Sequence, residues 1–252
     1  MIRKISASCL LLLMLFLHLE MAYASERVVL LSVPSDIWYK RVYLIADKKS
    51  WMDFENFTVQ IGDRGEIVYH FPNWYHGKYD PVLYYEDING DRLEDVIVVL
   101  NNDRAGIGTS LKDIHILNQI QDPFLRYKEV PVEPTDLTMS RLVKLERHGN
   151  IVIILADKEE YKIDISKYHF TNSRKPYLGM DTIEYSIENG TLNGTVNAYV
   201  VRDDSVYGGL LGHLTIEYFW DGKMYKAKSI TFKQNEPEKI RNTSVSPIEE
   251  TN

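Results

Sequence analysis

Residues 87–100 read DINGDRLEDVIVVL, an acidic segment that runs directly into an apolar one. The apolar part, residues 96–100, is rich in β-branched side chains and has the length of one strand. A second apolar run, residues 82–85, stands in front of the acidic segment. We therefore expect two neighbouring strands joined by an acidic loop, and this pair is the reference for reading the rest of the chain.

Oxygen-bearing side chains occupy the first, third, fifth and ninth positions of the acidic loop: Asp87, Asn89, Asp91 and Asp95. Leu93, at the seventh position, can contribute its main-chain carbonyl. Calcium takes about six to eight hard oxygen ligands, and alternate residues of a tight loop converge on one point. The spacing predicts a calcium site. The alternative is a metal-free hairpin turn, because an Asn-Gly pair between apolar runs also favours a tight turn.

The loop and the strand after it resemble the calcium loop of FG-GAP/VCBS-type repeats, whose pattern is D-x-N-G-D-G-x-x-D followed by an apolar strand. The resemblance implies that the four side chains and the Leu93 carbonyl bind calcium, and it implies a propeller-like arrangement of sheets. Arg92 stands where the family has glycine, and a non-glycine residue in the left-handed conformation costs about 1 kcal/mol. Val98 stands where the helical EF-hand loop has its bidentate glutamate.

Residues 1–24 have the three parts of a secretory signal peptide. Arg3 and Lys4 form a positive start, residues 10–17 are apolar, and Ala-Tyr-Ala at 22–24 is a cleavage pattern. We expect a mature chain that begins at Ser25 and is secreted to the extracellular space, the periplasm or the cell wall. An uncleaved anchor is the alternative, but the apolar run is shorter than the roughly 20 residues that span a membrane. The single cysteine, Cys9, lies inside this segment, so the mature chain forms no disulfide.

Short alternating or apolar runs separated by turn residues continue to the end of the chain and predict an all-β fold. We expect antiparallel sheets in an irregular propeller-like or sandwich arrangement. A proline-rich segment at 131–136 suggests a boundary between an N-terminal β unit, 25–133, and a hairpin-rich C-terminal unit, 134–233. The clearest hairpin turns at the Asp-Gly pair 221–222. Residues 234–252 are predicted to be a disordered tail.

The net charge of −7 and the lack of a basic patch argue against a nucleic-acid partner, and no membrane span is expected after signal cleavage. No nucleophile motif or zinc motif is present. We expect a non-catalytic module that binds an extracellular polymer or protein and is stabilised by calcium. The alternative is a secreted hydrolase, active on carbohydrate or cell wall, whose acidic residues meet only in the fold. Candidate ligand contacts are Trp74, Tyr75 and Tyr79, expected on a displayed loop at 71–79, although aromatic residues also form strands and cores.

Overall fold

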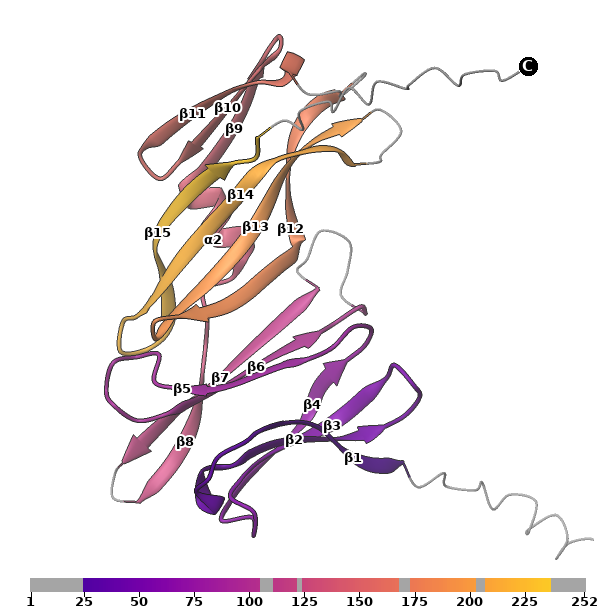
Figure 1. The fold of residues 1–252 in the computed structure, drawn as a ribbon, viewed down its shortest axis with the longest axis vertical. Helices are drawn as coiled ribbons and strands as arrows, with labels where there is room; N and C mark the ends of the chain where they lie inside the picture. Colours follow the sequence, from indigo (N-terminus) through magenta and orange to yellow (C-terminus); the bar gives the residue numbers. More distant parts are fainter. Residues whose placement is uncertain (1–24, 105–110, 122–123, 168–172, 203–206, 237–252) are drawn as a thin grey trace, which may run out of the picture.

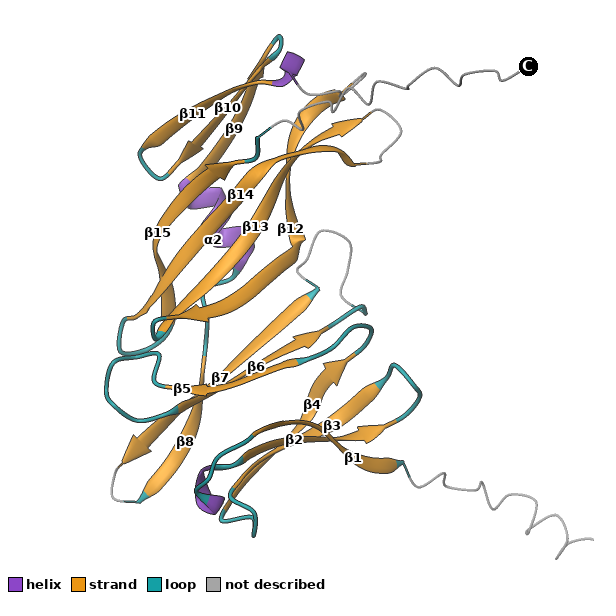
Figure 2. Ribbon diagram, in the orientation of Figure 1, coloured by secondary structure: helices purple, strands orange, loops and turns teal. Residues whose placement is uncertain are grey.

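Four antiparallel sheets follow one another along the chain in the computed structural model (Figure 1). The structure describes residues 25–104, 111–121, 124–167, 173–202 and 207–236. Strands dominate these residues and helices are short, so the predicted all-β class is confirmed (Figure 2). The expected signal peptide and most of the expected C-terminal tail lie outside the described residues. None of the described helices is long and apolar enough to cross a membrane.

The first two sheets come from the N-terminal half, and in each the strands pair in sequence order. The first contains β1 (Glu26–Val33), β2 (Val42–Lys48), β3 (Phe54–Ile61) and β4 (Ile67–His76), with a 3₁₀ turn, η1 (Trp38–Lys40), between β1 and β2. The second contains β5 (Val82–Glu86), β6 (Asp95–Asn101), β7 (Lys112–Gln121) and β8 (Leu125–Val130). Pairing between consecutive strands needs only hairpin turns, which explains the regular spacing of turn residues in the sequence.

The C-terminal half begins with a short helix, α2 (Thr135–Leu142), and forms the other two sheets. The third sheet contains β9 (Val143–His148), β10 (Ile151–Ala156) and β11 (Glu159–Asp164), and a 3₁₀ turn, η2 (Ile165–Lys167), follows it. The fourth contains β12 (Ser173–Glu188), β13 (Thr191–Arg202), β14 (Tyr207–Trp220) and β15 (Tyr225–Gln234). The predicted Asp-Gly turn joins β14 to β15, and Gly222 there has a φ of 91°.

Strand β6 lies at the centre of the molecule, and all seven of its residues are buried. Successive side chains of a strand point to opposite faces. Val96, Val98 and Leu100 enter the core between the first and second sheets. Ile97 enters the core on the opposite face, against the C-terminal half. A strand covered on both faces needs apolar residues without alternation, which accounts for the unbroken run at 96–100.

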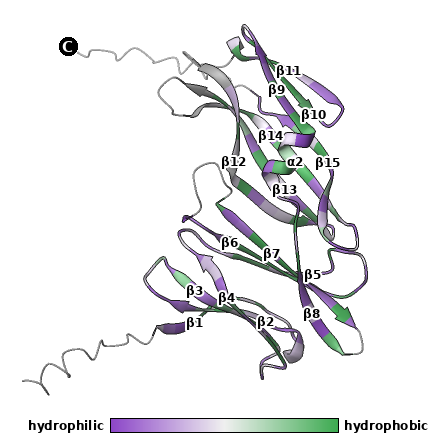
Figure 3. Ribbon diagram, turned by 180° about the vertical axis from the view of Figure 1, so that it is seen from behind, coloured by the Kyte–Doolittle hydropathy of each residue, from purple (hydrophilic) through white to green (hydrophobic). Residues whose placement is uncertain are grey.

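Two hydrophobic cores result from this arrangement, and the larger one crosses the expected unit boundary. It joins Ile97, Ile116 and Val130 of the second sheet, and Ile88 of the β5–β6 loop, to residues of α2 and of the third and fourth sheets. Hydrophobic and hydrophilic residues are interspersed along several strands (Figure 3), and in β2 and β10 buried residues alternate with more exposed ones. The chain therefore divides into sheets near residue 133, while the packing continues across that point.

The segment between the two halves, residues 131–133, is built into the edge of the fourth sheet beside β15. The Glu133 N–H donates to the Tyr225 carbonyl at 2.8 Å, and the Tyr225 N–H donates to the Pro131 carbonyl at 2.9 Å. The Glu133 carboxylate accepts the Ala227 N–H at 2.9 Å and pairs with Arg141 at 2.9 Å. Burial alone would raise the pKa of Glu133, but these two partners hold it below its ordinary value. The connection is thus a fixed part of the fold.

Candidate calcium loop and adjoining pocket

The first half of the acidic loop folds around the carboxylate of Asp87. Its Oδ1 accepts the N–H groups of Asn89 at 3.2 Å and Gly90 at 2.7 Å. Its Oδ2 accepts the N–H of Arg92 at 2.8 Å. Asp and Asn side chains commonly bond main-chain groups two residues further on and so stabilise tight turns. The carboxylate therefore holds the loop in a closed curve, as the spacing of its polar residues suggested.

The same type of bond continues through the rest of the loop. Asn89 Oδ1 accepts the Asp91 N–H at 2.8 Å, and Asp91 Oδ1 accepts the Leu93 N–H at 2.8 Å. Arg92 adopts a φ of 71°, the left-handed conformation that glycine provides in the repeat family. For a residue other than glycine this conformation costs about 1 kcal/mol of conformational free energy. The backbone nevertheless keeps the tight turn, although the sequence departs from the pattern.

Asp95 closes the loop at its base and is fully buried, with 0 % of its surface exposed. Its Oδ1 accepts the Gln119 N–H at 3.0 Å and its Oδ2 accepts the Ile88 N–H at 3.3 Å. Burial raises the pKa of Asp95 to about 7, and the nearby charges of Asp91 and Asp87 act in the same direction. A cation at this loop would favour the ionised form of all three carboxyl groups.

The donor set suits a hard cation, because it combines carboxylates, one amide oxygen and a main-chain carbonyl. The structure places Asp87, Asn89 and Asp91 in one turn and Asp95 beneath it. Among the described residues, no group of three or more His, Cys, Asp or Glu side chains lies in an arrangement that could hold a metal ion. The expected ligands Asp87, Asn89, Asp91, Leu93 and Asp95 thus stay a prediction.

The loop lies where the second sheet meets the fourth (Figure 1). A Cβ atom on Gly190, in the turn between β12 and β13, would come within 3.1 Å of the Asp87 carbonyl oxygen, and Gly190 has a φ of 72°, so both the close approach and the backbone conformation favour glycine here. The buried Tyr225 hydroxyl donates to Asn118 Oδ1 on β7 at 3.1 Å. Burial, together with the charge of Asp95, raises the pKa of Tyr225. The loop and its neighbours therefore fasten the two halves to each other.

A pocket of about 380 Å³ opens beside the loop at this junction. Its size is within the range of small-molecule sites. Three parts of the molecule form its walls: the loop, strands β7 and β8, and the β14–β15 hairpin. The loop contributes Asn89 and Asp91. Strands β7 and β8 contribute Asn118 and Lys128, and the hairpin contributes Trp220 and Lys223. These last four residues were not singled out from the sequence, because they are far apart in it and meet only through the packing of the two halves.

The structure corrects the expectation for Trp74. The segment from Phe71 to His76 is part of strand β4, not a displayed loop. Trp74 is 7 % exposed, and its ring stacks between Phe71, at a centroid distance of 3.9 Å, and His115, at 3.8 Å. Aromatic residues fit a half-buried pleated surface as readily as a binding loop. Trp74 is therefore a core residue.

Tyr75 and Tyr79 differ from Trp74 and from each other. The Tyr75 hydroxyl lies 2.7 Å from Asp53 Oδ1 and 2.8 Å from Asp103 Oδ1, while the Arg104 guanidinium lies 3.7 Å from the ring centroid. Tyr79 is 80 % exposed and has a φ of 73°. Neither residue lines the pocket beside the calcium-type loop. A role of either in ligand contact stays a prediction.

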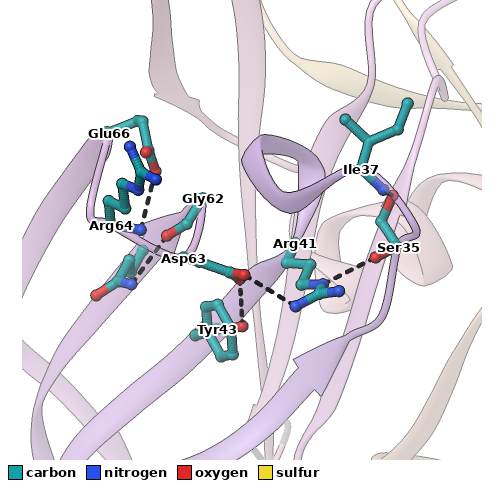
Figure 4. A network of polar contacts seen from close by, with 9 residues as sticks. Ser35, Ile37, Arg41, Tyr43, Gly62, Asp63, Arg64 and Glu66 are labelled. Carbon is teal, nitrogen blue, oxygen red and sulfur yellow. Dashed lines mark hydrogen bonds and ion pairs between the residues drawn. The ribbon is translucent and has the colours of Figure 1, made fainter.

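A second polar cluster lies in the first sheet, where the β3–β4 turn meets the residues before and in β2 (Figure 4). Asp63 pairs with Arg41 at 2.8 Å and accepts the Tyr43 hydroxyl at 2.7 Å. The hydrogen bond to Asp63 raises the pKa of Tyr43. Arg41 also donates from Nε to the Ser35 carbonyl at 2.8 Å. The charges of Arg41 and Asp63 thus satisfy each other, and the pair fastens the β3–β4 turn to the start of β2.

No family model, no curated protein and no solved structure matches this chain.

Proposed function

We propose that the protein is an exported, non-catalytic β module that binds an extracellular polymer or protein and is stabilised by calcium. The position of the 87–95 loop at the junction of the two halves carries the proposal. Asp95 ties the loop to β7, and the Asp87 carbonyl lies against the turn at Gly190. An ion held by this loop would fix the contact between the halves and also one wall of the pocket.

Electrostatics supports a cation at this position. Asp87, Asp91 and Asp95 bring three carboxyl groups into nine residues, and like charges so close repel one another unless one is protonated or a cation lies between them. Without a metal, burial and the repulsion from Asp91 and Asp87 raise the pKa of Asp95 and so favour its protonated form. The resemblance to the FG-GAP/VCBS calcium loop supports the same assignment from the residue pattern.

The hydrolase alternative requires two carboxylates that face one another across the pocket. The acids that line it are Asp91 and Glu129. Asp91 Oδ1 bonds to the loop main chain, and Glu129 Oε1 lies 2.9 Å from His115 Nδ1. Both acids are thus engaged in local contacts, and this favours binding over hydrolysis.

Thermal unfolding of the mature protein, with calcium and with a chelator, tests the proposal. An ion that binds only the native state adds about 1.4 kcal/mol to the free energy of unfolding when its free concentration is about ten times its Kd. The melting temperature should therefore rise with calcium. Asp91→Asn keeps the side-chain oxygen that accepts the Leu93 N–H but removes the charge, and it should abolish the rise. Glu86→Gln, an exposed acid just before the loop, should leave it unchanged. A wild-type protein with no rise, or a rise that Asp91→Asn retains, would refute calcium binding by this loop.

A further inference from the structure

We propose that the pocket beside the loop binds a uronic acid unit, a sugar ring that carries a carboxylate, of an extracellular polysaccharide. This inference rests on the proposed function as a binding module and names its ligand class. Three observations carry it: two ammonium groups without partners, a buried amide with its oxygen occupied, and an indole at the wall of the pocket.

The ammonium groups are those of Lys128, on β8, and Lys223, in the β14–β15 turn, and both residues line the pocket. Within the described part of the chain, neither has an ion-pair or hydrogen-bond partner for its side chain. Other lysines of the same hairpin are paired: Lys226 with Asp221 at 2.6 Å, and Lys228 with Glu217 at 2.5 Å. The two pocket lysines, which come from two different parts of the wall, are therefore available to bind an anionic group.

The amide belongs to Asn118, which is only 5 % exposed and lines the same pocket. Its Oδ1 accepts the Tyr225 hydroxyl at 3.1 Å, and this bond sets the orientation of the amide. The Nδ2 group is then left as a donor, and it has no partner among the described residues. It is not one of the buried side-chain atoms that lack a partner, so it is an accessible donor at the wall of the pocket, where a ligand oxygen can accept its hydrogen bond. The pocket thus presents donors to a ligand rich in oxygen atoms.

The indole is that of Trp220, the last residue of β14. It is half-buried and packs against the Tyr225 ring, with 5.1 Å between the centroids. Because Tyr225 is fully buried, it holds the indole in place before any ligand arrives. An aromatic wall together with a few fixed polar groups is typical of sites that orient a small ligand. A sugar ring can cover the indole with its C–H face while its carboxylate reaches the lysines.

Asp91 relates this pocket to the loop, because its side chain belongs to both. Its negative charge would repel a carboxylate ligand, and a calcium ion at the loop would offset that charge. Uronate binding should therefore be measured with calcium present.

Isothermal titration calorimetry of the mature protein with trigalacturonate, and with maltotriose as a neutral sugar of equal length, tests the inference. We expect trigalacturonate to bind and maltotriose to bind at least about tenfold more weakly, a difference of about 1.4 kcal/mol. The double variant Lys128→Ala/Lys223→Ala should lose about tenfold or more in affinity. The matched control, Lys226→Ala/Lys228→Ala, also removes two positive charges, from strand β15 outside the pocket, and should bind within about twofold of wild type.

A second variant tests whether the amide of Asn118 faces the ligand. Asn118→Asp keeps an oxygen for the Tyr225 hydroxyl but replaces the amide donor by a negative charge, so it should abolish trigalacturonate binding. The inference is overturned if wild type does not bind trigalacturonate, if both lysine pairs weaken binding equally, or if maltotriose binds as well. The calcium melting experiment is independent: stabilisation without uronate binding removes this inference alone, and uronate binding without stabilisation removes only the calcium assignment.

Discussion

Asp95 Oδ1 accepts the main-chain N–H of Gln119 at 3.0 Å and so joins the base of the acidic loop to strand β7. The second oxygen of the same carboxyl group accepts the N–H of Ile88 at the start of the loop. One buried side chain thus holds the loop closed and fixes it to the neighbouring strand. The protonation state of Asp95 therefore affects both the loop and the junction.

Stability in the absence of calcium should fall as the pH rises toward neutrality. Burial raises the pKa of Asp95 to about 7 from an ordinary 3.8. A group with a raised native pKa stabilises fully below its unfolded pKa, and this contribution is lost as the pH rises through the native pKa. The difference corresponds to on the order of 4 kcal/mol. Chemical denaturation of wild type and Asp95→Asn in chelator, between about pH 4 and 8, should show wild type losing stability relative to the variant.

Asp91→Asn provides the control for this pH dependence. It leaves the buried carboxyl group in place, so it should keep most of the loss of stability with pH while it abolishes the response to calcium. In wild type, calcium should stabilise more at pH 8 than at pH 5, because the ion competes with the proton for the same carboxyl groups. A wild-type profile parallel to that of Asp95→Asn would show that Asp95 is already ionised in the native protein.

Glu133→Ala should destabilise the protein by about 1–3 kcal/mol, because it leaves the Ala227 N–H and the Arg141 guanidinium without their carboxylate partner. Glu146→Ala is the matched control: this glutamate also has a side-chain partner, His148 Nε2 at 3.3 Å, but its own side chain is 61 % exposed. Exposed pairs contribute little, so this change should stay within about 0.5 kcal/mol. Urea denaturation measures both, and equal effects would show that the connecting segment is not held by Glu133.

Trp74→Ala should cost about 3–5 kcal/mol, as expected for removing a large side chain from a packed core. Tyr79→Ala, at a side chain that is 80 % exposed, should change the free energy of unfolding by less than about 0.5 kcal/mol. Thermal and urea denaturation of the two variants compare them directly. A mild effect of Trp74→Ala would contradict its place between Phe71 and His115.

Export should release a mature chain that begins at Ser25, because Ala-Tyr-Ala at 22–24 follows a charged start and an apolar run. N-terminal sequencing of protein recovered from the culture medium or the periplasm gives the first residue directly. Recovery of the intact chain from Met1 in a membrane fraction would instead support an uncleaved anchor.

Local features of the fold were predictable from the sequence, and long-range ones were not. The strand at 96–100 and the hairpin at the Asp-Gly turn 221–222 are determined by residues that are close in sequence, and both are found where they were expected. Trp74 could not be placed, because its burial depends on His115 from another sheet. The pocket depends on Asn118, Lys128 and Trp220 meeting across the junction, and no spacing in the sequence indicates such a meeting.

The hydrogen bond between Glu133 and Ala227 joins residues that are 94 positions apart, and the segment 131–133 pairs with Tyr225 beside it. A chain that is synthesised from its N-terminus exposes this segment long before its partner has been made. Until the final hairpin arrives, the main-chain groups of Pro131 and Glu133 stay open to water or to other chains. Contacts of such long sequence separation slow folding. The connecting segment and the larger core are therefore completed only when the β14–β15 hairpin is in place, and a chain cut short before Tyr225 lacks the part of that core that β15 supplies.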